Sequence, residues 1–149
     1  MLHSQISVPL KSLRAPEQRV VTMLRAWQNG EAAQAEVWTS LCRSMSTGRA
    51  RSCLQAFEHM LMLLRKHGWK PLSIHPADHA QASADEADLA RFVMAATEQE
   101  RDLALAQATF LVSGSAILPL LCAASRFGLP LLCEECRLRV LSPPPPNLH

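Results

Sequence analysis

The stretch 48-GRARSCLQAFEHMLMLLRKHG-68 decides the fold class of this chain. Its apolar residues recur at spacings of three and four, which predicts one broad apolar face on a helix: Cys53, Leu54, Phe57, Met60, Leu61 and Leu64. Basic residues 65–67 suit the last turn of a helix, and Gly68 suits its end. A helix over residues 48–67 would be about 30 Å long and would cross a domain. We therefore predict a central helix in which Phe57 and Leu61, with Trp38 from a neighbouring helix, are almost fully buried.

The flanking sequence predicts further helices on both sides of this one. Pro16 and Gly30 fit the two ends of a first helix, and a second runs from about Ala32 to Met45, with Ser46 or Thr47 as the next N-cap. Later helices are predicted after the capping box Ser83/Glu86, over about 99–111, and up to Gly128. Their predicted inward-facing residues include Leu89, Phe92, Val93, Ala96, Leu103, Ala106, Phe110, Leu111, Ile117, Leu118, Leu121 and Ala124.

Two parts of the chain do not follow the helical pattern. The segment that begins at Trp69 contains Pro71 and Pro76, so it is predicted to be irregular, with Trp69 anchoring its start. After Gly128 the sequence is compatible with a strand, a short helix or a lid. No strand partner for a sheet is evident. The predicted class is all-α: a compact bundle of about six helices with a central third helix and an irregular C-terminal tail.

The length and composition fit one domain. The 149 residues are 48% apolar and only 5% aromatic, and the chain is large enough for one core. We expect a flexible leader at 1–15, a helical domain at 16–141 and a disordered proline-rich tail at 142–149. No apolar run reaches the roughly 20 residues of a membrane span, so no membrane partner is expected. Five cysteines, an odd number, fit reduced thiols in a cytoplasm.

Charge is distributed unevenly along the chain. Residues 1–74 carry a net charge of +6 and residues 75–149 a net charge of −4. Such halves can pack with complementary faces, within a monomer or across a homodimer. A basic binding surface on the first half is the alternative.

Three stretches combine helical patterning with Trp and Asp-Glu landmarks: AEVWTSLCRSM, CLQAFEHMLMLL and ADEADLARFVMAA. In this arrangement the chain resembles small all-helical proteins of alphaproteobacteria that have no assigned activity. The resemblance covers roughly residues 17–128. It implies an all-helical fold and supplies no catalytic residues.

Motifs of known enzyme classes are absent from the sequence. There is no G-x-S-x-G, Walker loop, G-x-G-x-x-G or H-E-x-x-H. Cys42, Cys53 and Cys122 lie on apolar helical faces and are predicted to be small core residues. Because no convergent acid, base or nucleophile can be named, an enzyme is the less favoured interpretation.

Arg43, Arg49 and Arg51 surround the break between the second and third helices. Arginine is disfavoured at a helix N-terminus, so Arg49 and Arg51 invite a functional explanation. A helix-turn-helix module would present such residues to nucleic acid, and free backbone amides with guanidinium groups would also suit another anion. The alternative is a solvated arginine face, which the mild pI of 8.4 favours.

A zinc site is the second candidate. His75 and His79 have H-x-x-x-H spacing, and Cys133 and Cys136 form C-x-x-C, so each pair could supply half of a tetrahedral site. Solvated histidines and packed or idle thiols are the alternative for each pair. Dithiol redox chemistry is a further possibility, although no βαβ context accompanies it.

These observations favour a non-catalytic interaction or regulatory domain of a bacterial cytoplasm, with a protein partner or a second copy of itself and no cofactor. A zinc-stabilised helical protein is the first alternative. A nucleic-acid-binding module is the second.

Overall fold

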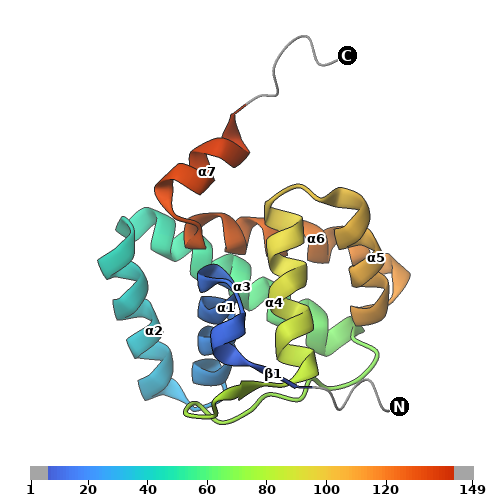
Figure 1. Ribbon diagram of the computed structural model, residues 1–149, viewed down its shortest axis with the longest axis horizontal. Helices are drawn as coiled ribbons and strands as arrows, with labels where there is room; N and C mark the ends of the chain where they lie inside the picture. Colours follow the sequence, from blue (N-terminus) through green and yellow to red (C-terminus); the bar gives the residue numbers. More distant parts are fainter. Residues whose placement is uncertain (1–6, 143–149) are drawn as a thin grey trace.

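The computed structural model describes residues 7–142, which contain seven α-helices and one hydrophobic core (Figure 1). The all-α prediction is confirmed, with one helix more than the six expected. The helices are α1 (Ala15–Trp27), α2 (Glu31–Ser44), α3 (Thr47–His67), α4 (Ala84–Thr97), α5 (Arg101–Leu111), α6 (Ile117–Gly128) and α7 (Glu134–Leu141).

The central position of α3 is confirmed. It packs most extensively against α6, which in turn packs against α4. Phe57 is fully buried and lies between two aromatic rings, 5.3 Å from the ring of Trp27 and 4.9 Å from that of Phe127. The prediction that Leu61 and Trp38 are almost fully buried is wrong, because both are only half-buried at the edge of the core. Trp38 belongs to α2, which lies on the outside of the bundle (Figure 1).

Helices α4 and α6 approach each other closely at Gly128. A Cβ atom at this position would collide with the Thr97 hydroxyl of α4. Thr97 is itself buried and donates its hydroxyl proton to the Val93 carbonyl at 2.7 Å. Glycine therefore allows the contact that closes this side of the core.

The inward face of α5 was predicted wrongly. Its buried residues are Ala104 and Ala108, not Leu103, Ala106 and Phe110, which are exposed. The helix contacts α4 and α6 through small residues, which permit a close approach and leave the larger side chains outside. The same correction applies to Leu118 and Cys122 of α6, which are exposed.

A small antiparallel ladder corrects the expectation that no strand finds a partner. Strand β1 (Val8–Pro9) pairs with β2 (Gln81–Ala82), and a 3-10 turn η2 (Leu10–Ser12) leads into α1. Residues 7–15, assigned above to a flexible leader, thus take part in the fold, and Leu13 is buried. Residues 1–6 and 143–149, the rest of the predicted leader and nearly all of the predicted tail, lie outside the described residues.

The chain after α6 is a short helix, one of the three alternatives considered, and not an irregular tail. A 3-10 turn, η4 (Leu129–Leu131), leads to α7, which projects from the bundle (Figure 1). By length and mean hydropathy, 1.3, the stretch Gly114–Leu131 qualifies as a membrane span, contrary to the expectation from the sequence. In this fold it is divided into η3 (Gly114–Ala116), α6 and η4, and α6 packs between α3 and α4 as a core helix.

Candidate functional site

The irregular segment between α3 and α4 is fixed by a buried ion pair. Arg25 of α1 and Glu86 of α4 are 2% and 0% exposed. Two hydrogen bonds join them, Nε to Oε2 at 2.9 Å and Nη2 to Oε1 at 3.0 Å. Burying a charge is very unfavourable unless the charge is paired and hydrogen-bonded, so each partner is needed by the other.

Both partners also bind the backbone of the irregular segment. Arg25 donates to the carbonyls of His79 and Gln81, at 2.8 Å each. Glu86 accepts from the amide of His75 at 3.1 Å. The ion pair therefore connects α1, α4 and the segment between α3 and α4 at one point.

The predicted capping box at the start of α4 is confirmed and uses the same glutamate. Ser83 N donates to Glu86 Oε1 at 2.9 Å, and Glu86 N donates to Ser83 Oγ at 3.0 Å. Burial alone would raise the pKa of Glu86, but hydrogen bonds from Arg25 and from the backbone of Ser83 and His75 outweigh it and lower the pKa. Glu86 is thus a stable carboxylate with a structural role.

The first part of the fixed segment forms one wall of an apolar cleft. The cleft has a volume of about 490 Å³ and lies between α1, α3 and residues 68–74. Its apolar lining includes Leu24, Trp27, Leu61, Leu64, Leu72 and Ile74. Arg65 and Lys70 supply positive charge at its border, and no Asp, Glu, His or Cys of residues 7–142 lines it. A cleft of this size, mostly apolar with few polar groups, is typical of a binding site.

A second hollow of about 560 Å³ adjoins the cleft on the other side of residues 70–72. Lys70, Leu72 and Leu111 line both. The second hollow has the opposite charge, because Asp85 and Asp88 of α4 line it. We call it the acidic hollow, and we call the cleft and the hollow together the α3–α5 surface.

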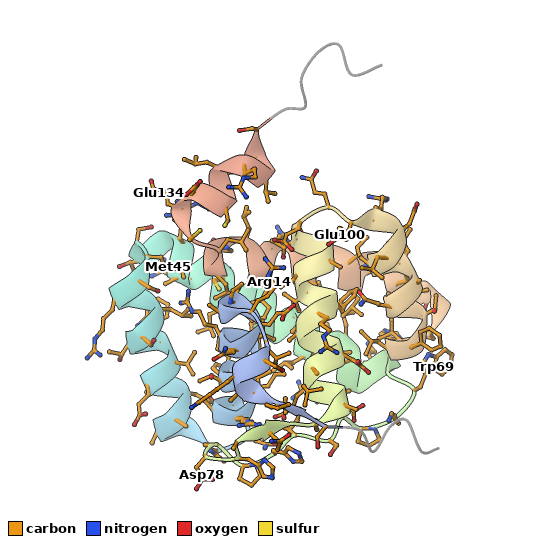
Figure 2. The ribbon with its side chains drawn as sticks, in the orientation of Figure 1. Arg14, Met45, Trp69, Asp78, Glu100 and Glu134 are labelled. Atoms are coloured by element: carbon orange, nitrogen blue, oxygen red, sulfur yellow. The ribbon has the colours of Figure 1, made fainter. Side chains whose placement is uncertain are left out.

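Two aromatic side chains stand exposed on the α3–α5 surface. Trp69 lines the cleft and is 64% exposed, and Phe110 lines the acidic hollow and is 82% exposed. The indole Nε1 of Trp69 donates to the Thr109 carbonyl at 2.9 Å, which holds Trp69 against α5. Trp69 therefore anchors the start of the irregular segment, as predicted, but does so at the surface (Figure 2).

The α3–α5 surface also contains an unsatisfied polar atom. Gln107 Oε1 is buried and has no hydrogen-bond partner, and it is the only such side-chain atom among residues 7–142. Gln107 lines the acidic hollow. A hydrogen-bond donor entering the hollow could satisfy this atom, since a buried acceptor without a donor is destabilising.

The four predicted zinc ligands are not brought together. His75 and His79 stack with ring centroids 4.1 Å apart, in the loop that contains Asp78. Cys133 and Cys136 lie beside Glu134, at the opposite end of the molecule from Asp78 (Figure 2). Within the described part of the chain, no group of three or more His, Cys, Asp or Glu side chains could hold a metal.

The three arginines at the α2–α3 turn are all exposed. Ser46 is the N-cap of α3 and accepts from the Arg49 amide at 3.3 Å, which confirms one of the two predicted caps. Ala50 and Cys53 face the core, so any contact of the helix-turn-helix kind would have to use the opposite, exposed face of α3, which includes Arg49 and Arg51. Of the three arginines, Arg49 lines a groove that also contains the two cysteines of α7, whereas Arg43 and Arg51 do not line it.

That groove has a volume of about 600 Å³. Cys133 is the N-cap of α7, and its sulfur accepts from the Cys136 amide at 3.3 Å. The thiol–thiol hydrogen bond and the bond from the Cys136 amide lower the pKa of Cys133, and the partner thiol raises the pKa of Cys136. The other cysteines differ: Cys53 is buried, and desolvation raises its pKa to about 12.

Sequence reasoning missed the ion pair and the α3–α5 surface. A signal for the ion pair was present, since Arg25 follows Leu24 and lies four residues after Val21, on the apolar face of α1. The α3–α5 surface has no comparable signal in the sequence. It depends on which side of α5 faces the core, and the helical period alone allowed more than one choice.

Comparisons of the chain with protein-family models, with curated proteins and with solved structures give no match.

Proposed function

We propose that this protein is a non-catalytic interaction domain that binds an amphipathic helix of a protein partner on the α3–α5 surface. The observation that carries the proposal is the apolar cleft bordered by two indoles, Trp27 and Trp69, beside the exposed ring of Phe110. Tryptophan is over-represented among the residues that dominate binding energy at protein interfaces. Exposed aromatic side chains that gather on one face mark such interfaces.

The shape favours a helix over a compact ligand. The cleft and the acidic hollow adjoin and share Lys70, Leu72 and Leu111 in their linings, so one extended segment could contact both. An amphipathic helix can place apolar side chains at positions i, i+4 and i+7 along such a surface. The charges at its two ends favour one orientation.

Charge complementarity defines the chemistry of the partner. Arg65 borders the cleft and makes no ion pair within the described residues, whereas Lys70 already pairs with Asp85 at 3.4 Å. Asp88 and the unsatisfied Gln107 lie at the other end, in the acidic hollow. We therefore expect an acidic residue of the partner near Arg65 and a lysine or arginine near Asp88.

Two further observations support a binding role in a reducing compartment. Among the described residues, no Asp, Glu, His, Cys or Ser side chain lines the cleft, and Lys70, which does line it, is paired with Asp85 at 3.4 Å. All five cysteines are free thiols, which suits the bacterial cytoplasm that we propose as the location.

The test is a selection from a displayed library of amphipathic helical peptides. We expect enrichment of sequences with three apolar positions in helical spacing, an acidic residue at one end and a basic residue at the other. The selected peptide should lose most of its affinity for the Phe110→Ala and Arg65→Glu variants. Leu138→Ala on α7 and Arg51→Glu at the far end of α3 are the matched controls, because each removes a similarly exposed side chain elsewhere.

Enrichment of peptides that bind all four variants equally well would contradict the proposal. So would self-association of the free protein through this surface, detected as a dimer that Phe110→Ala dissociates. In that case the partner would be a second copy of the chain.

A further inference from the structure

The groove that contains Cys133 and Cys136 is lined by these two thiols and by four guanidinium groups. It lies between the start of α1, the α2–α3 turn and α7. Its charged lining comprises Arg14, Arg19, Arg49, Arg137 and Glu134. The lining therefore carries a clear excess of positive charge next to Cys133 and Cys136.

Two of these arginines already form hydrogen bonds within the protein, and the other two are free to bind a ligand. Arg14 forms two hydrogen bonds of 2.7 Å with Glu98, and Arg19 donates to the Leu131 carbonyl at 3.3 Å. Arg49 and Arg137 form no ion pair or side-chain hydrogen bond within residues 7–142. Guanidinium groups bind carboxylates well, with two parallel hydrogen bonds.

The two cysteines are arranged as an attacking and a resolving thiol. Cys133 is exposed at the N-cap of α7, and Cys136 is half-buried one turn later. The Cys136 amide and the helix N-terminus stabilise negative charge on the Cys133 sulfur. A C-x-x-C pair at the start of a helix can close a disulfide without unfolding the helix.

We propose that Cys133 and Cys136 form a reversible dithiol–disulfide couple that exchanges with small disulfides bearing carboxylates, which the arginines of the groove attract. This site is separate from the α3–α5 surface and goes beyond the function proposed for it.

The exchange is a balanced two-electron reaction. The Cys133 thiolate attacks one sulfur of the small disulfide, a mixed disulfide forms, and the first small thiolate leaves and takes up a proton. Cys136 then loses its proton to solvent and attacks the Cys133 sulfur, which releases the second small thiol. The protein loses two hydrogens, and the small disulfide is reduced to two thiols.

The experiment treats the reduced, full-length protein with three disulfides of different charge: oxidised glutathione, neutral 2-hydroxyethyl disulfide and cationic cystamine. Peptide mass spectrometry follows each cysteine over time. Cys122, an exposed thiol on α6, is the internal control for exposure alone, because it lies outside this groove in a hollow that Arg101 and Arg126 also line. We expect Cys133 and Cys136 to lose two hydrogens without retaining an adduct, and the Cys136→Ser variant to hold a stable glutathione adduct on Cys133.

The charge series tests the role of the arginines. At low ionic strength, oxidised glutathione should react at Cys133 about 10-fold faster than cystamine does, after each rate is divided by that of the same disulfide with a small free thiol. Changing Arg49 and Arg137 to Gln should remove most of this preference, so that the rate with oxidised glutathione falls much more than the rate with 2-hydroxyethyl disulfide. A Cys133 rate that does not depend on probe charge would overturn the attraction by arginine. An adduct at Cys122 that forms as fast as reaction at Cys133 would overturn the couple itself.

Discussion

Two arginines at opposite ends of α1 show how differently this fold uses the same side chain. Arg25 is 2% exposed, is paired with Glu86 and donates to two carbonyls as well. Arg14 forms an ion pair of equally good geometry with Glu98, but its side chain is 49% exposed and that of Glu98 is 24% exposed. The two arginines are eleven residues apart, roughly 16 Å along the helix.

Burial, not hydrogen-bond length, determines how much an ion pair contributes to the stability of this fold. Removing one partner of a buried pair leaves an uncompensated charge in the core. Removing one partner of an exposed pair leaves a charge that water can solvate. In this protein the buried pair fixes the chain at His75, directly after the wall of the apolar cleft, and Arg14 of the exposed pair lines the groove that contains Cys133 and Cys136.

Substitution of Arg25 should have the largest effect on stability. Arg25→Ala should lower the free energy of unfolding by about 3–5 kcal/mol, since Glu86 and two backbone carbonyls lose their donor. Urea denaturation measures this loss. The double variant Arg25→Met/Glu86→Leu should recover much of the stability, because apolar residues can replace a buried pair. If Arg25→Ala lowers the free energy of unfolding by less than about 1 kcal/mol, the buried Arg25–Glu86 pair is no more important for stability than the exposed pair at Arg14.

The acid side of the stability profile tests Glu86 directly. Its pKa is lower in the folded protein than in the unfolded chain. The contribution of the Glu86 carboxylate to stability is therefore fully present above the ordinary glutamate pKa of about 4.3. It disappears as the pH falls through the lower pKa that Glu86 has in the folded protein. Thermal unfolding between pH 7 and pH 3 should show Glu86→Gln much less stable than the wild type at pH 7, with the gap narrowing in acid. A gap that stays constant over this range would show that the charge of Glu86 is not what stabilises the fold.

Arg14→Ala should have a small effect of about 0.2–1 kcal/mol. Because the Arg14–Glu98 pair is exposed, this loss should shrink further in 1 M salt, whereas the loss for Arg25→Ala should persist. Denaturation of the two variants at low and high salt provides the comparison. If salt changes the stability loss equally in both variants, burial does not distinguish the two ion pairs.

Phe110→Ala should have the smallest effect on stability, within about 0.5 kcal/mol, because an exposed side chain loses little when it is truncated. The same variant should abolish most binding of the selected peptide. A Phe110→Ala variant that unfolds more easily by more than about 2 kcal/mol would mean that Phe110 has a structural role and is not an exposed binding residue.

The sequence predicted the fold where one physical signal dominated. The apolar face of residues 48–67 identified the central helix and the burial of Phe57, and the Ser83/Glu86 spacing identified the start of α4. Prediction failed where two faces of a helix were both apolar, as in α5, whose buried Ala104 and Ala108 could not be distinguished from Phe110 by period alone.

The candidate sites were harder to predict because they depend on contacts between distant residues. The pairing of Arg25 with Glu86 spans sixty-one positions, and the α3–α5 surface combines residues of four helices, α1, α3, α4 and α5, with the segment after α3. The two cysteines of α7 were recognised from their spacing. Their proximity to Arg49 could not be read from the sequence, since it depends on where α7 lies against the α2–α3 turn.

The most direct test of the central claim is amide chemical-shift mapping of the 16.4 kDa protein during titration with the tightest selected peptide. We predict that the largest shifts fall within residues 61–74 and 107–111, which include most of the residues that line the α3–α5 surface, and that residues 133–141 of α7 stay unchanged. The largest shifts in α7 and the α2–α3 turn, with none around Trp69 and Phe110, would contradict the assignment of the α3–α5 surface as the binding site.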